Sequence, residues 1–311
     1  MTYLERERQR LVAARDTLFR DPGQGVFSGA PRDFVLLEPA QNLWAGIRDD
    51  AVDYFRRNGI SWWRGAQDDP TGHLLSSQVA CVNHLYALRQ RLDAATALLR
   101  GLDSDIEEAE HIDDGFVAFE FIGERQYLKE RGFTRGAHCT SVDAAMIGRT
   151  RSGERRLFLI EWKYTETYRP GDDKYVAARA AVYDALIEAA DSPFRGVRAS
   201  DLYFEPFYQL MRQTLLGQQM ARHRDHGCES FRHLHVAPDG NLEFHRAVTA
   251  PALGRADVYE TWRSVLKEPE AFITRSPEAM LRPALTKADM HSLNNYLRSR
   301  YWAEAPIPNQ R

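Results

Sequence analysis

Lysine, cysteine and long apolar runs are scarce in this chain of 311 residues. Five of its 41 Lys+Arg residues are lysines, which leaves 36 arginines. Three cysteines are too few and too scattered for a disulfide framework, which favours a reducing cytosol. No run approaches the ~20 apolar residues of a membrane span, and the charged N-terminus lacks an apolar signal core. We therefore expect a soluble, cytoplasmic protein with no membrane partner.

Net positive charge is also absent, since the formal net charge is −3. Without a global basic field, the chain can meet a polyanion only through local clusters of arginine. Hydrophobic residues make up 43% of the chain, which is enough to bury a sizeable core. The length allows either one large domain or two small ones.

The stretch 140–165 predicts an antiparallel β-hairpin. Two apolar runs flank a polar tip at 149–156 that contains Ser-Gly. Because side chains alternate along a strand, Glu161 and Lys163 share one face, and the other face is wholly apolar or aromatic. Asp143, near the start of the first strand, lies opposite the end of the second. We therefore expect Asp143, Glu161 and Lys163 to converge.

Two carboxylates and a lysine at one sheet end suit the chemistry of a bound divalent cation. Carboxylate oxygens bind Mg²⁺, which keeps open positions for water and phosphate. The metal lowers the pKa of bound water and neutralises charge on a phosphoryl group. The ammonium of Lys163 can orient the water or stabilise a transition-state anion.

The scarcity of lysine gives weight to Lys163. A cation needed only for bulk charge would here be an arginine, whereas a lysine fits a role for a compact, tunable ammonium. The acid and the lysine also emerge from an apolar run at 157–162, and the end of a buried strand needs a reason to carry charge. A buried structural ion pair of Lys163 with Asp143 or Glu161 is the alternative.

Three further polar features accompany this hairpin. Glu120 interrupts an otherwise apolar strand at 115–122, where a charge is costly unless it is paired or bound to metal. Gln78 lies in a strong predicted helix that begins at His73, and mid-helix polar residues there either support a site or bond to nearby loops. Gln209 and Gln213 continue a polar stripe on a long helix at 204–220.

The Asp…Glu-x-Lys arrangement resembles the PD-(D/E)xK nuclease superfamily, the fold of many restriction endonucleases. Asp143 matches the D, and Glu161-Trp162-Lys163 matches the E-x-K. Val142 stands where the superfamily has proline, a residue that makes no catalytic contact. The predicted elements match the α-β-β-β-α-β core of that superfamily at 73–91, 115–123, 140–149, 156–165, 204–222 and 231–237.

The wider pattern resembles a bacterial family of restriction endonucleases within this superfamily. It is carried by H-L-L-S-S-Q-V-A-C-V-N-H-L at 73–85, F-E at 119–120, T-S-V-D at 140–143, E-W-K-Y-T-E at 161–166 and Y-L-R-S-R-Y at 296–301. The resemblance implies a mixed α/β fold with a central mixed sheet, in a single domain of residues 1–311. Residues 71–250 would form the nuclease core, between helical extensions at 1–70 and 251–311.

The activity implied is hydrolysis of DNA phosphodiester bonds with Mg²⁺ or Mn²⁺. Asp143, Glu161 and Glu120 would hold the metal, and Lys163 would assist the attacking water. Gln78, Gln209 and Gln213 would hold these ligands in place through hydrogen bonds. The protein would also form a homodimer. Apart from the resemblance, the slightly negative net charge predicts that DNA phosphates meet the arginines at Arg149, Arg151, Arg155, Arg156 and Arg169, with a merely soluble hairpin tip as the alternative.

Other functions stay open at this point. A non-catalytic nucleic-acid-binding or assembly protein could keep the same fold. RNA processing is a third option, although nothing in the chain reads a 2′-hydroxyl. The crowding of His223, His226, Cys228, His233 and His235 does not match a common zinc module, so we expect polar histidines at the surface there. The adjacent Trp62 and Trp63 are read as core residues, with base stacking as the alternative.

Overall fold

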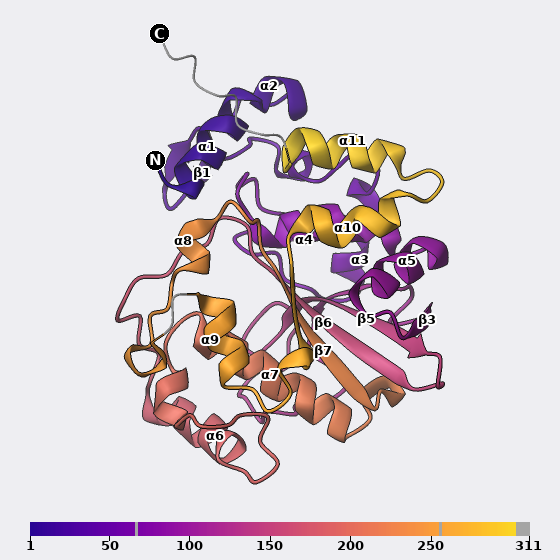
Figure 1. The fold of residues 1–311 in the computed structure, drawn as a ribbon. Coiled ribbons are helices and arrows are strands. Elements are labelled where there is room, and N and C mark those ends of the chain that lie inside the picture. Colours follow the sequence, from indigo (N-terminus) through magenta and orange to yellow (C-terminus); the bar gives the residue numbers. More distant parts are fainter. Residues whose placement is uncertain (66–67, 255–256, 303–311) are drawn as a thin grey trace.

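The computed structural model describes residues 1–65, 68–254 and 257–302. A central sheet crosses the molecule, with helices on both of its faces (Figure 1). The predicted hairpin is confirmed: β5 (Val142–Thr150) pairs antiparallel with β6 (Arg155–Trp162) around the polar tip. The fold is therefore built around the stretch that carries Asp143 and Glu161.

The sheet has six strands and is mixed. β3 (Ile106–Glu110) and β4 (Ala118–Phe121) both pair antiparallel with β5, at its end and its start. On the other side, β7 (Ser230–Val236) is parallel to β6, and β8 (Phe272–Arg275) is parallel to β7. With α4 (Ser77–Leu85) and α7 (Phe207–Arg222), the predicted order helix, strand, strand, strand, helix, strand is present.

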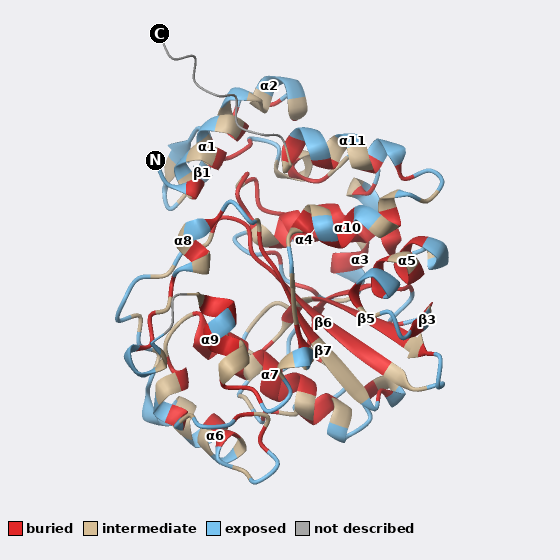
Figure 2. Cartoon of the chain, viewed as in Figure 1, coloured by how far each residue is buried: buried red, intermediate tan, exposed pale blue. Residues whose placement is uncertain are grey.

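The two faces of β6 enter different parts of the core. Phe158 and Ile160 pack with Val79 of α4, whereas Leu157 and Leu159 pack with residues of α7. This confirms the predicted alternation along the strand. Figure 2 shows that the central strands are buried through most of their length. The face toward α7 is therefore the one on which the acids of the hairpin fall.

The remaining helices divide between the two faces. The α4 side carries α1 (Tyr3–Ala13), α2 (Arg15–Leu18), α3 (Arg48–Arg57), α5 (Leu92–Leu102), α10 (Pro277–Leu285) and α11 (His291–Arg300). The α7 side carries α6 (Ala177–Ile187), α8 (Leu242–His245) and α9 (Val258–Ser264). No helix in these described ranges is long and apolar enough to cross a bilayer.

Three segments differ from what their sequences alone predict. The acidic composition of 103–114 predicts solvated surface, but this stretch contains β3, whose Ile106 and Ala109 turn into the core. The sequence 241–247 reads as a strand, but it contains the short helix α8, whose first turn is capped by the Asn241 side chain, which accepts the Phe244 N–H. Glycine and proline at 21–30 predict a loop, but the segment includes β1 (Gly25–Phe27), which pairs with β2 (Ala30–Arg32).

Candidate active site

The strand register places three acids on one row of the sheet. The residue pairs of β4 and β5 keep the same register on both sides of Glu120 and Asp143. These two residues therefore lie opposite each other on the two strands. The β5–β6 pairs end at Ala144 with Ile160, and one step further Asp143 faces Glu161. A chain of 311 residues thus brings Glu120, Asp143 and Glu161 to one sheet end from three neighbouring strands.

Glu161 is held by three donors and is almost completely buried. The Lys163 ammonium donates to its Oε1 at 2.6 Å, and the Gln209 amide donates to the same oxygen at 2.8 Å. The Gln213 amide donates to its Oε2 at 2.5 Å. Lys163 also donates to Gln209 Oε1 at 2.6 Å. The two predicted glutamines of α7 therefore support Glu161, and the predicted contact of Glu161 with Lys163 is present as a buried ion pair.

Gln213 is itself fixed by a histidine that sequence reasoning did not assign to the site. Its amide nitrogen also donates to the Ser141 carbonyl at 3.1 Å, so its oxygen must face His233 Nε2, 3.2 Å away. His233 Nε2 must then carry the proton and donate to the Gln213 oxygen. His233 Nδ1 is left as an acceptor, and the Thr214 hydroxyl, 3.0 Å away, donates to it. Burial lowers the pKa of His233 to about 3, so the ring is neutral.

Glu120 occupies an unusual backbone conformation for a strand residue. Its φ of 47° lies in the left-handed region, which bulky L-residues seldom adopt. The carboxylate accepts from the Gln78 amide at 2.7 Å and from the Ser141 hydroxyl at 3.1 Å. Strained residues of this kind persist only where their surroundings over-determine them, and they concentrate at functional sites. The predicted support of Glu120 by Gln78 is thus present.

Asp143 is the member of the row that is partly open to solvent. Its Oδ2 accepts the backbone N–H of Trp162 at 2.6 Å. Burial raises the pKa of the Asp143 carboxyl well above its ordinary value, and the charges of Glu161 and Glu120 raise it further. Burial, with a contribution from Glu161, likewise raises the pKa of Glu120 to about 7. Burial and the mutual repulsion of the three acids therefore disfavour full ionisation of the row.

Lys163 is the one cation that touches the row among the described residues. Burial alone would lower the pKa of its ammonium, but the neighbouring acids, Glu161 first, raise it well above its ordinary value. Lys163 is therefore protonated at neutral pH. It can donate to an anion, and it does not act as a base.

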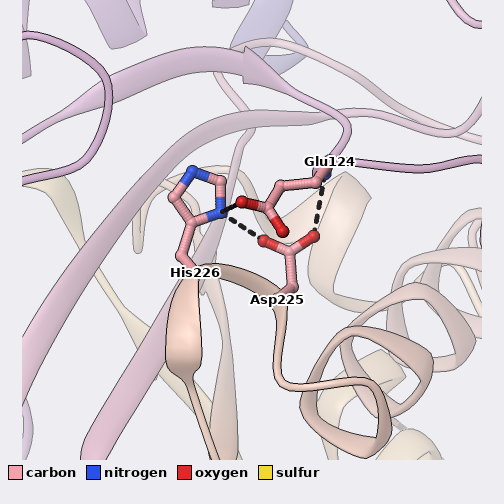
Figure 3. A group of neighbouring side chains, drawn as sticks. All are labelled: Glu124, Asp225 and His226. Carbon is pink, nitrogen blue, oxygen red and sulfur yellow. Dashed lines mark hydrogen bonds and ion pairs between the residues drawn. The ribbon is translucent and has the colours of Figure 1, made fainter.

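A different group of side chains meets the geometric requirement for a metal site most closely. Within the described ranges, Glu124, Asp225 and His226 each bring one ligand atom to within 4.8 Å of the others (Figure 3). Glu120, Asp143 and Glu161 do not form such a three-ligand group among the described residues, and each accepts hydrogen bonds from donors of its own. His233 and His235, expected at the surface, are instead buried on β7. The hydroxyls of Thr214 and Tyr259 lie 3.0 and 2.9 Å from their Nδ1 atoms, so the buried rings have polar partners.

Four of the five arginines expected to meet DNA lie at the hairpin tip, as predicted, and this is the far end of β5 and β6 from Asp143 and Glu161. Arg169 lies instead in the loop that follows β6. Arg149 forms ion pairs with Glu107 and Glu110, and the latter also binds Arg155 at 2.6 Å. Arg156 binds Asp103 at 2.7 Å. Acids of β3 and Asp103 thus pair with three of these arginines, Arg149, Arg155 and Arg156, which leaves those three less available to a phosphate.

Comparison with known families places the chain among the restriction endonucleases, because one family model matches residues 9–302. That model describes the REase-ARP family, Restriction Endonuclease associating with ARP, and the chain belongs to it. A search of curated proteins and a search of solved structures found no match.

Proposed function

We propose that the protein is a metal-dependent nuclease that hydrolyses DNA phosphodiester bonds at the row Glu120, Asp143 and Glu161. The observation that carries the proposal is the convergence of three carboxyl groups from neighbouring strands, beside one ammonium among the described residues. A buried cluster of this kind is costly unless a cation shares it. Membership in a restriction endonuclease family supports DNA as the substrate.

The donor set fits Mg²⁺ or Mn²⁺. Carboxylate oxygens are the ligands these ions prefer, and Asp143, Glu161 and Glu120 would provide them. Bound at such a site, the ion supplies a nucleophilic water at neutral pH and neutralises phosphate charge. Gln209 and Gln213 orient Glu161, while Gln78 and Ser141 orient Glu120.

Lys163 would serve the reaction as a charge donor. Its ammonium is protonated and is held by Glu161 and Gln209, so it is pre-oriented before substrate arrives. Removing one preorganised donor of this kind costs on the order of 10²–10³ in rate. Lys163→Ala should therefore bind DNA and metal yet cleave far more slowly. Lys163→Arg should restore little, because a planar guanidinium has another shape and does not match a compact ammonium.

The test is single-turnover cleavage of DNA by wild type and Lys163→Ala, with Mg²⁺ and with EDTA, beside thermal melts of the same samples. Lys174→Ala, which removes the partner of Asp172 on a more exposed loop, is the matched control. If Lys163 is only the structural partner of Glu161, activity should fall in step with the folded fraction. A fully active Lys163→Ala protein would end the assignment.

The rival function is a nucleic-acid-binding or assembly protein that keeps the fold without cleavage. Binding of DNA with no cleavage under any divalent cation would favour this rival. The resemblance also implies a homodimer, which light scattering of the purified protein tests. Cleavage of RNA in place of DNA would redirect the substrate but keep the site.

A further inference from the structure

The neighbouring tryptophans at 62 and 63 have separate roles. Trp62 is buried and stacks on Phe55 with ring centroids 3.7 Å apart, as expected of a core residue. Trp63 is 46% exposed, which is unusual for so large an apolar side chain. Its ring rests on Phe27 of β1 and on His73, with centroids 6.2 and 5.7 Å away. Trp63 is thus held in place from one side and open on another.

Arg64 adds charge to this exposed ring. Its guanidinium lies 6.0 Å from the Trp63 ring centroid and 5.7 Å from that of Phe27. Across the part of the chain that the structure describes, Arg64 forms no ion pair, in contrast to the arginines of the hairpin tip. Trp63, Arg64 and Phe27 are called the Trp63 shelf below. An open aromatic face beside an unneutralised guanidinium matches the two parts of a nucleotide, its base and its phosphate.

The shelf is connected directly to the row of acids. The Trp63 backbone N–H donates to Gln78 Oε1 at 2.8 Å, and the Gln78 amide donates to Glu120 at 2.7 Å. Gln78 also donates to the Ser61 carbonyl at 3.1 Å, which fixes both ends of its amide. One side chain therefore positions the shelf and a proposed metal ligand together.

We propose that the Trp63 shelf binds an unpaired nucleobase of the DNA strand by stacking on Trp63, with Arg64 on an adjacent phosphate, beside the candidate active site. This inference rests on the proposed function and narrows its substrate to DNA with a single-stranded segment. In a duplex each base is stacked between its neighbours, and unstacking it to reach the Trp63 ring costs energy. An unpaired base in a single-stranded segment can stack on Trp63 without that cost.

Binding is measured in the Lys163→Ala background with Mg²⁺, by fluorescence anisotropy of a labelled single-stranded oligonucleotide and of its blunt duplex. Trp63→Leu should weaken binding to the single strand on the order of 10- to 100-fold, because it removes stacking of one base. Binding to the duplex should change little. Trp63→Phe should retain most of the affinity, since phenylalanine keeps a π-face that leucine lacks. Thermal melts check that each variant is folded.

Salt dependence separates the two residues of the shelf. The affinity for a single strand falls with salt, and Arg64→Gln should make the negative slope of log affinity against log salt shallower by about 0.7. This is the value for one lost phosphate contact. Trp63→Leu should weaken binding at every salt concentration without changing that slope. The matched control is Tyr175→Leu, which removes another exposed aromatic, one whose ring packs edge-on against Tyr203. It should leave both quantities unchanged.

Three results would overturn the inference. The first is that Trp63→Leu binds the single strand with the affinity of its parent. The second is that Trp63→Phe binds the single strand as weakly as Trp63→Leu, and the third is that neither the single strand nor the duplex is bound. Its failure differs from failure of the proposed function. Wild-type protein that cleaves DNA while Trp63→Leu binds normally contradicts the shelf alone. Wild-type protein that never cleaves, with binding that still depends on Trp63, contradicts the nuclease alone.

Discussion

Two groups of acids lie near opposite ends of α7, and their charges are balanced in different ways. Glu120, Asp143 and Glu161 gather at its N-terminal half, whereas Asp225 follows its C-terminus beside Glu124 and His226. In the first group the pKa values of Asp143 and Glu120 are raised, by burial first and by neighbouring acids second. In the second group, burial acts to raise the pKa of Asp225, but hydrogen bonds from its neighbours outweigh it and lower that pKa.

The second group is complete without a metal. Both oxygens of Asp225 have donors: His226 on one side, and the Tyr127 hydroxyl at 2.6 Å and the Glu124 N–H at 2.8 Å on the other. The hydrogen bond to Asp225 raises the pKa of His226, which favours the protonated imidazole over the neutral form that ligates a cation. Our proposal therefore assigns the metal to Glu120, Asp143 and Glu161, although the ligand atoms of the second group approach one another more closely.

The largest expected effect tests which group binds the metal. Asp143→Asn should abolish both cleavage and the rise in melting temperature that Mg²⁺ or Mn²⁺ gives the wild type. Metal at 100 times its dissociation constant stabilises a protein by about 2.7 kcal/mol, so the wild-type rise should be several degrees. Asp225→Asn should melt lower throughout, because it breaks the bonds of a buried acid, yet keep the full metal-dependent rise. The reverse pattern in a thermal-shift assay would assign the metal to Glu124, Asp225 and His226.

A second prediction concerns the residues that hold Glu161 in place. Thr214→Val removes the hydroxyl bonded to His233, which leaves the imidazole and then the Gln213 amide free to reorient. Outer partners of metal ligands commonly contribute 10- to 100-fold to metal affinity or activity, and we expect a loss in that range in Mn²⁺ titrations. Tyr259→Phe is the matched control, since it removes the hydroxyl bonded to His235 on the same strand. Equal losses in both variants would show a general effect of the β7 histidines.

The sequence predicted the hairpin and the acids because both depend on local pattern. Alternation fixes the faces of β6, and a charge inside an apolar strand marks Glu120. What it did not predict depends on distant partners. β3 forms from an acidic stretch because Arg149 and Arg155 of the hairpin tip neutralise its glutamates. His233 joins the site only through Gln213, a contact between α7 and β7 that no spacing encodes. The left-handed backbone at Glu120 likewise has no sequence signal, since the residue is not glycine.

The third prediction is a pH dependence at Glu120. Its pKa of about 7 in the folded protein exceeds that of the unfolded chain, so the folded state binds the extra proton between about pH 4.5 and 7. Stability without divalent cation should therefore fall as pH rises through this range, by an amount on the order of 1–3 kcal/mol. Glu120→Gln should flatten the slope in urea titrations from pH 4.5 to 8. A variant that is simply unfolded would show instead that Glu120 is half of a structural pair.

The smallest expected effect comes from His226, and its pH window is different. Because the folded pKa of His226 is raised, its bond to Asp225 stabilises the protein fully below the unfolded value of about 6.5 and is lost as pH rises through the folded value. His226→Gln should therefore lower stability more at pH 5.5 than at pH 9, where the imidazole has lost its charge. Asp225 keeps the Tyr127 hydroxyl and the Glu124 N–H as donors, which limits the loss. Since the imidazole is not a ligand in our proposal, the metal-dependent rise in melting temperature should survive this substitution. If His226→Gln removes that rise while Asp143→Asn retains it, the balanced group is the metal site, and the contrast between the two clusters fails.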